Sequence, residues 1–231
     1  MNKFWKWSVI DESEDIKPER VLSLDGVIAE ESWFDDDVTP KMFSEELNSD
    51  GGDVTVRINS PGGDVFAAAQ IYNMLREYSA SKGKVTVKID SLAASAASVI
   101  AMAGDEVLMS PVSMLMIHNP STIAAGERRD MEQAINMLDA VKNSIIEAYH
   151  KKTGLSEKAL SDMMNDETWM NAGMAIKKHF ADGYIGDKIP AENTVMFARV
   201  PFIKKVTAQM KTTLVPADEL YSRLEKLKSG F

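Results

Sequence analysis

The chain has 231 residues, 45% of them hydrophobic and 26% charged, so it is long and apolar enough to bury a sizeable core. Its formal net charge of -9 argues against nucleic acid as the main partner. The chain has no cysteine, which excludes disulfides, thiol nucleophiles and cysteine-bound zinc, and its three histidines are too few to favour a histidine-rich metal site. The composition therefore predicts a globular protein that binds neither nucleic acid nor metal.

The N-terminal 20 residues, MNKFWKWSVIDESEDIKPER, give no targeting signal. They lack the apolar core and the small-residue cleavage site of a signal peptide. No run of about 18 apolar residues, the length that a membrane span needs, occurs anywhere in the sequence. We therefore expect a cytoplasmic protein that opens with a loose arm over residues 1–20.

From residue 21 onward, strand and helix patterns alternate. Strands are predicted at 21–28, 54–58 and 85–89, and helices at 39–48, 65–81 and around 99–102. This alternation implies parallel strands joined by right-handed crossovers. We therefore predict an α/β fold.

The second half of the chain is predicted to be mostly helical. Two short strands come first, and the second of them ends at His118. Beyond Pro190 the composition changes to a polar linker and a charged helix after Pro216, so the core domain is expected to close near residue 190. The predicted elements are strands at 107–109 and 114–117, a long amphipathic helix at 126–150, and shorter helices at 155–164 and 171–179.

A run of small residues, Ser91-Leu-Ala-Ala-Ser95-Ala-Ala-Ser98, lies where the third strand turns into a helix. Unpaired N–H groups and the positive end of the helix dipole at such a turn suit a developing oxyanion. The alternative is that alanine and serine simply allow a helix to pack closely. The run therefore predicts either a nucleophile turn or a tightly packed helix start.

Three motifs in order, Asn59-Ser-Pro-Gly-Gly63, the serine run and Ile117-His-Asn-Pro120, resemble those of the ClpP family of serine peptidases. The resemblance covers about residues 21–189. The forms INSPGGDVFAAAQIYN, AASAAS and MIHNP are most similar to the ClpP-related head maturation (prohead) proteases of tailed phages and prophages. The resemblance implies a ClpP/crotonase-like domain over 21–190, with a projecting helical handle at about 126–164 and a C-terminal extension over 191–231.

The resemblance implies that Ser95 is the nucleophile and His118 its general base. The family's Ala-Ala-Ser turn matches Ser95, whereas Ser98 lies one helical turn later and is interpreted as a packing residue. The N–H groups of Gly63 and Ala96 are expected to form the oxyanion hole, because glycine lets the backbone approach a substrate carbonyl.

The resemblance is less specific about the acid that orients the histidine. Asp166, Asp182 and Asp187 all lie in the stretch where the family keeps this residue. The match of the preceding helix favours Asp182, although His179 stands where glycine is usual. If Gly183-Tyr-Ile-Gly186 is the true turn, Asp187 takes the role.

The expected partners are further copies of the same chain, arranged as a homo-oligomeric ring or stacked rings. The apolar stripe of the helix at 126–150 favours this self-association. The predicted substrates are capsid or scaffold proteins in a bacterial host cytoplasm or in assembling phage heads, and no cofactor, nucleic acid or membrane is required. An ATPase partner is not expected, because residues 1–20 do not resemble the axial loops of housekeeping ClpP.

Three other functions remain open at this point. A housekeeping-type ClpP subunit would degrade unfolded proteins with an ATPase. A non-catalytic ring would act in assembly alone, and the intact serine, histidine and aspartate set argues against it. An acyl-CoA enzyme of the wider crotonase fold would not need the serine and histidine pair.

Overall fold

The computed structural model describes residues 4–10, 19–28 and 40–186, so the expected C-terminal extension and Asp187 lie outside the described residues. Strands and helices alternate along the described chain in the predicted way. In order they are β1 (Trp5–Ile10), β2 (Glu19–Ile28), α1 (Pro40–Asn48), β3 (Val54–Gly63), α2 (Val65–Ser81), β4 (Val85–Ala94), α3 (Ala96–Ala101), β5 (Glu106–Met109), β6 (Met114–Ile117), α4 (Arg128–Thr153), α5 (Glu157–Asn165), β7 (Thr168–Asn171), α6 (Ala172–Lys177) and β8 (Gly183–Tyr184).

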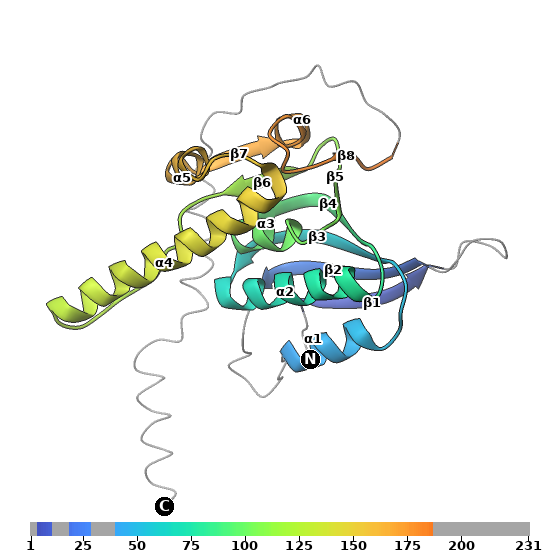
Figure 1. The fold of residues 1–231 in the computed structure, drawn as a ribbon, viewed down its shortest axis with the longest axis horizontal. Helices are drawn as coiled ribbons and strands as arrows, with labels where there is room; N and C mark the ends of the chain where they lie inside the picture. Colours follow the sequence, from blue (N-terminus) through green and yellow to red (C-terminus); the bar gives the residue numbers. More distant parts are fainter. Residues whose placement is uncertain (1–3, 11–18, 29–39, 187–231) are drawn as a thin grey trace, which may run out of the picture. The chain divides into compact units, whose positions relative to one another are not determined.

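One sheet organises these elements, in the order β1-β2-β3-β4-β5-β8 (Figure 1). Strands β2 to β5 are parallel, as the alternation predicted, so the α/β fold is confirmed. The alternating valines and isoleucines of β3 and β4 are at most 1% exposed, because helices pack over the sheet. The apolar alternation in the sequence therefore marks the centre of the core.

Strand β4 is long enough to pair with two strands on the same side. Its first part, Thr86–Ile89, pairs with β5, and its last part, Leu92–Ala94, pairs with β6. Because both pairings are parallel, the carboxyl ends of β4 and β6 lie together, whereas β5 lies beside the beginning of β4. This division decides which residues can meet after the strands end.

The N-terminal region differs from the expected loose arm. Residues 5–10 form β1, which pairs antiparallel with β2 from Trp5↔Leu24 to Ile10↔Glu19. Trp5 is only 4% exposed and its ring packs edge-on against Phe43 of α1. Aromatic side chains at alternate positions thus give this strand a buried face that a polar arm would lack.

Helix α4 is the predicted long amphipathic helix, and Figure 1 shows it running away from the sheet. Its buried side chains all lie in its last third, from Ile145 to Thr153. In the first half, Ile135 is 58% exposed and Met137 is 42% exposed. Even this helix is too polar to cross a bilayer, and no other helix in the described ranges has the length and apolar character to do so.

Candidate active site

Ser95 occupies a strained turn between β4 and α3. Its backbone has φ 55° and ψ -126°, a conformation that side-chain-bearing residues rarely adopt. The Ser95 N–H donates to the carbonyl oxygen of Met116 in β6 at 3.0 Å. The sharp turn and this bond together direct the serine side chain toward the end of β6.

His118 follows directly after β6, and its Nε2 atom lies 2.7 Å from the Oγ atom of Ser95. The parallel register that pairs Ala94 with Met116 brings the two residues together, because each follows the carboxyl end of its strand. This distance is a hydrogen bond, as expected for a hydroxyl nucleophile and its base. The structure therefore joins the two residues that the motifs singled out.

The environment of His118 favours its neutral form. Burial lowers the pKa of His118 below its ordinary value of 6.5, and the charge of Glu167 opposes this in part. A neutral imidazole can accept a proton at pH 7, whereas an imidazolium cannot.

The Ser-Pro-Gly-Gly turn at the end of β3 packs directly against the serine turn. Ser60 is fully buried, and its Oγ atom donates to the Gly26 carbonyl oxygen at 2.5 Å and accepts from the Gly62 N–H at 3.1 Å. A Cβ atom added to Gly62, whose φ is +96°, would lie 2.9 Å from the Ala96 nitrogen and 2.7 Å from the Ser95 Cβ atom. Only glycine fits at position 62, so the two turns abut without an intervening side chain.

Ser98 is in a different environment from Ser95. It is fully buried, and its Oγ atom donates to the Ser95 carbonyl oxygen at 2.6 Å. Its second contact is with the hydroxyl of Tyr149, at 2.7 Å. A buried hydroxyl with both contacts made inside the core agrees with the packing role expected for Ser98.

The structure does not bring Asp182 to His118. The Oδ2 atom of Asp182 accepts hydrogen bonds from the Val107 N–H at 2.7 Å and from Lys152 Nζ at 2.6 Å. The Asp182 N–H in turn donates to the Val107 carbonyl oxygen at 2.7 Å. Asp182 therefore joins the beginning of β5 to the last turn of α4, and the expectation that it orients the imidazole is not met.

The register of the sheet explains why Asp182 lies far from Ser95 and His118. Val107 pairs with Val87, near the beginning of β4, whereas Ser95 follows the end of the same strand. The intervening segment of roughly eight residues corresponds to about 25 Å of extended strand. No aspartate side chain spans that length. His179, three residues before Asp182, has φ 63°, a left-handed conformation that glycine commonly adopts. This is the position where the sequence has histidine instead of the family's usual glycine.

The carboxylate whose charge acts on His118, within the described residues, is that of Glu167. Strand β7 pairs antiparallel with β6 as far as Ile117↔Thr168, so His118 and Glu167 each lie one residue beyond this last pair. The Glu167 Oε1 atom accepts from the Trp169 indole N–H at 3.1 Å, which fixes the carboxylate. Glu167 was not predicted from the sequence because β7 was not predicted. The signal available for β7 was the Thr-Trp-Met alternation between two predicted helices.

No metal-binding group is apparent in the ranges that the structure describes. Nowhere there do three or more histidine, aspartate or glutamate side chains gather closely enough to hold an ion. The chemistry that this arrangement offers directly is therefore that of the Ser95 hydroxyl and the His118 imidazole.

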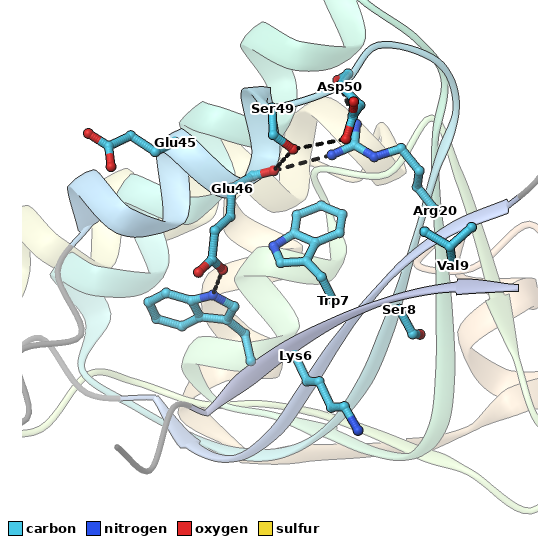
Figure 2. Close-up of a pocket in the computed structure, with 10 residues that line it drawn as sticks. Lys6, Trp7, Ser8, Val9, Arg20, Glu45, Glu46, Ser49 and Asp50 are labelled. Atoms are coloured by element: carbon cyan, nitrogen blue, oxygen red, sulfur yellow. Dashed lines mark hydrogen bonds between the residues drawn. The ribbon is translucent and has the colours of Figure 1, made fainter.

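A hollow of about 670 Å³ lies apart from these residues, at the β1–β2 hairpin and α1 (Figure 2). The Arg20 guanidinium stacks 4.9 Å from the Trp7 ring centre and donates to the Asp50 carbonyl oxygen at 2.7 Å. Arg20 pairs with Val54 at the beginning of β3, so the hollow lies toward the amino ends of the strands. The Ser95–His118 pair lies at the carboxyl ends, and the hollow is therefore not part of it.

Comparison with known proteins agrees with this geometry. A family model described as Clp protease matches residues 7–188. The ATP-dependent Clp protease proteolytic subunit 1 of Protochlamydia amoebophila is 30% identical over 163 residues, which cover 68% of this chain and 77% of the relative. Subunit 1 of Chlamydia muridarum is 29% identical over 165 residues, covering 66% of this chain and 84% of the relative. The proteolytic subunit of Deinococcus radiodurans is 30% identical over 158 residues, covering 67% and 76%.

These relatives carry the housekeeping name, and none of those three is named as a phage head maturation protease. The family model, in contrast, covers most of the chain, including the glycine turn and the strands that bring Ser95 to His118. The broader of the two expected resemblances is thereby confirmed, and this chain belongs to the Clp protease family of serine peptidases.

Proposed function

We propose that this protein is a serine endopeptidase in which Ser95 is the nucleophile and His118 the general base. The observation that carries the proposal is the 2.7 Å hydrogen bond between Ser95 Oγ and His118 Nε2. Ser95 Oγ attacks the scissile carbonyl carbon while His118 Nε2 takes the hydroxyl proton and later gives it to the leaving amine. Water then hydrolyses the acyl ester by the same proton path.

Glu167 is the carboxylate proposed to position His118, in place of Asp182. It lies one residue before the last β6–β7 pair, as His118 lies one residue after it, and its charge favours the imidazolium that forms when His118 takes the proton. Asp182 is already paired with Lys152 at the other end of β4. Because the Trp169 indole N–H holds the Glu167 carboxylate, Glu167 is proposed to take the role that was expected of Asp182.

The oxyanion formed in this reaction is proposed to bind the N–H groups of Gly63 and Ala96. The close approach of Gly62 to the Ala96 nitrogen supports this proposal, because it leaves the two turns in direct contact. Loss of one such donor costs about 2.7 to 4 kcal/mol of transition-state stabilisation in other serine peptidases. The pair would therefore contribute as much to the rate as any other group of the site.

Self-association through α4 is also part of the proposal. The first half of this helix has no buried residue, yet it carries the exposed apolar side chains Ile135 and Met137. Exposed apolar residues on a helix that extends from its domain favour burial against another copy. We therefore expect a homo-oligomeric ring.

The proposed substrates are capsid or scaffold proteins processed during phage head maturation. The forms INSPGGDVFAAAQIYN and MIHNP support this choice through their resemblance to prophage enzymes. The second candidate is degradation of unfolded proteins together with an ATPase. The names of the relatives from Protochlamydia, Chlamydia and Deinococcus favour this second candidate.

Labelling of the purified protein with a fluorophosphonate probe tests the chemistry. Mass spectrometry should find the probe on Ser95 and not on Ser98, because only Ser95 contacts His118. Labelling elsewhere, or none in the assembled protein, would overturn the assignment of Ser95.

A second assay separates the two substrate classes. The purified protein is incubated with a folded capsid precursor and with an unfolded protein, each with and without ATP and a Clp ATPase. Cleavage of the capsid precursor without ATP would support head maturation. Degradation of the unfolded protein only with ATP and the ATPase would support the housekeeping function instead.

A further inference from the structure

A chain of two buried hydroxyls leads from helix α4 to the backbone of Ser95. Ser98 Oγ donates to the Ser95 carbonyl oxygen at 2.6 Å, and the Tyr149 hydroxyl lies 2.7 Å from the same Oγ atom. A serine hydroxyl has a single hydrogen, which here goes to the carbonyl. Tyr149 must therefore be the donor in its contact with Ser98.

Both side chains are well placed to keep this arrangement. Ser98 is fully buried and Tyr149 is 1% exposed. Burial raises the pKa of the Tyr149 phenol, so the hydroxyl keeps its proton and remains a donor. The Tyr149 ring also packs edge-on against Phe180, with ring centres 5.6 Å apart, which fixes the direction of the hydroxyl.

The accepting carbonyl belongs to the residue whose backbone is strained. A conformation such as that of Ser95 persists only where surrounding contacts hold it. The Ser95 N–H is held by Met116, and its carbonyl oxygen accepts from both the N–H of Ser98, at 3.0 Å, and the Ser98 hydroxyl. Two of the three bonds that hold the Ser95 peptide groups thus come from Ser98, and one of those two is made by the hydroxyl that contacts Tyr149.

We propose that Tyr149 and Ser98 form a positioning relay, in which Tyr149 donates to Ser98 and Ser98 donates to the Ser95 carbonyl, so that the Ser95 hydroxyl stays aligned with His118. Neither residue touches the substrate in this relay. The relay rests on the proposed function, because it presumes that Ser95 is the nucleophile. It assigns a role in catalysis to the second serine of the Ala-Ala-Ser-Ala-Ala-Ser run and to the buried end of α4.

The test uses the full-length protein and a fluorophosphonate probe, with Tyr149→Phe, Ser98→Ala and the double variant. The limiting labelling rate at saturating probe, the half-saturating concentration and the final labelled fraction are measured separately. Each single variant should slow the limiting rate about tenfold while the other two quantities stay unchanged. The double variant should be no slower than Ser98→Ala, because the two hydroxyls act in series.

Ser113→Ala is the matched control. Ser113 is also buried, and its hydroxyl donates to the carbonyl oxygen three residues earlier, Ser110, at 2.8 Å. It precedes β6, at the opposite end of that strand from His118. Its loss should lower the melting temperature about as much as Ser98→Ala does, and leave the limiting rate unchanged.

The relay would be overturned by wild-type rates in both single variants, by a fall in the labelled fraction alone, or by equal slowing in Ser113→Ala. Rate losses that multiply in the double variant would also overturn it, because the hydroxyls would then act independently. If the wild-type protein is not labelled at Ser95, the proposed function fails and the relay fails with it. Normal wild-type labelling with unaffected variants removes the relay alone.

Discussion

Two strand pairs near the end of the sheet, β6–β7 and β5–β8, each hold a carboxylate, yet the two carboxylates have different partners. Beside β6–β7, Glu167 and His118 flank the last strand pair, Ile117↔Thr168, and the charge of Glu167 acts on the imidazole. In β5–β8, Asp182 binds the Val107 N–H and Lys152. The two strand pairs differ because β5 pairs with the beginning of β4, whereas β6 pairs with its end. A carboxylate near a catalytic motif in sequence thus takes its role from the register of its strand.

The largest effect that this comparison predicts comes from the histidine of the β6–β7 pair. His118→Ala should reduce fluorophosphonate labelling of Ser95 by about 10⁴-fold or more, because the hydroxyl loses its base. His150→Ala is the control, since His150 is exposed on α4 and its Nδ1 atom makes a hydrogen bond with the Leu155 carbonyl oxygen, away from Ser95. Equal labelling of the His118→Ala and His150→Ala variants would contradict the role of His118 as the base.

The next effect separates the two acids. Glu167→Gln should reduce turnover about 100-fold, less than the roughly 10⁴-fold measured where the acid hydrogen-bonds the histidine directly. Asp182→Asn should stay within about twofold of wild type per folded molecule, because Asp182 faces β5 and α4. Peptide turnover and the labelling rate check both variants. A larger loss in Asp182→Asn than in Glu167→Gln would reverse the assignment.

The same aspartate should matter more for stability. Lys152 is only 12% exposed at its side chain, so Asp182→Asn leaves a largely buried ammonium without its anion. Because Asp182 itself is 44% exposed, we expect a modest loss of about 1 to 2 kcal/mol in the free energy of unfolding. Urea denaturation measures this loss. Asp162→Asn, which breaks an exposed pair with Lys158, should cost less than Asp182→Asn, and an equally large cost would refute the distinction.

The smallest effect concerns pH. The base must be neutral, and burial lowers the pKa of His118, so the midpoint of the acid limb of the labelling rate should lie below pH 6.5. The Glu167 charge raises the pKa of His118, so Glu167→Gln should move this acid limb to lower pH. Asp182→Asn should leave the limb in place. A limb that moves upward in Glu167→Gln, or equally in both variants, would contradict the placement of the two charges.

Much of the fold could be predicted because long apolar alternation and capping residues report local structure. β2 to β6, α1 to α5 and the position of His118 at the end of β6 follow the predicted pattern closely. Ser156, for example, caps α5, near the start of the helix predicted at 155–164, by accepting from the Ala159 N–H.

The elements that were missed depend on pairing partners far away in the sequence. β7 has four residues between two helices and β8 has only two, and each is stabilised as a strand by β6 or β5 beside it. Glu167 was not predicted as a candidate for the same reason, since the β6–β7 pairing brings its charge near His118. Ser95 and His118 could be singled out because the short motifs that carry the resemblance, Ala-Ala-Ser95 and Ile-His118-Asn-Pro, are local in the sequence.

The positive φ of Ser95 has a consequence for how this position responds to selection. Glycine adopts that conformation without the cost of about 1 to 3 kcal/mol that a serine backbone incurs there. A screen for thermal robustness alone would therefore reward glycine at position 95 and discard the hydroxyl in the process. Serine at this position therefore indicates selection for chemistry, because selection for backbone stability alone would favour glycine.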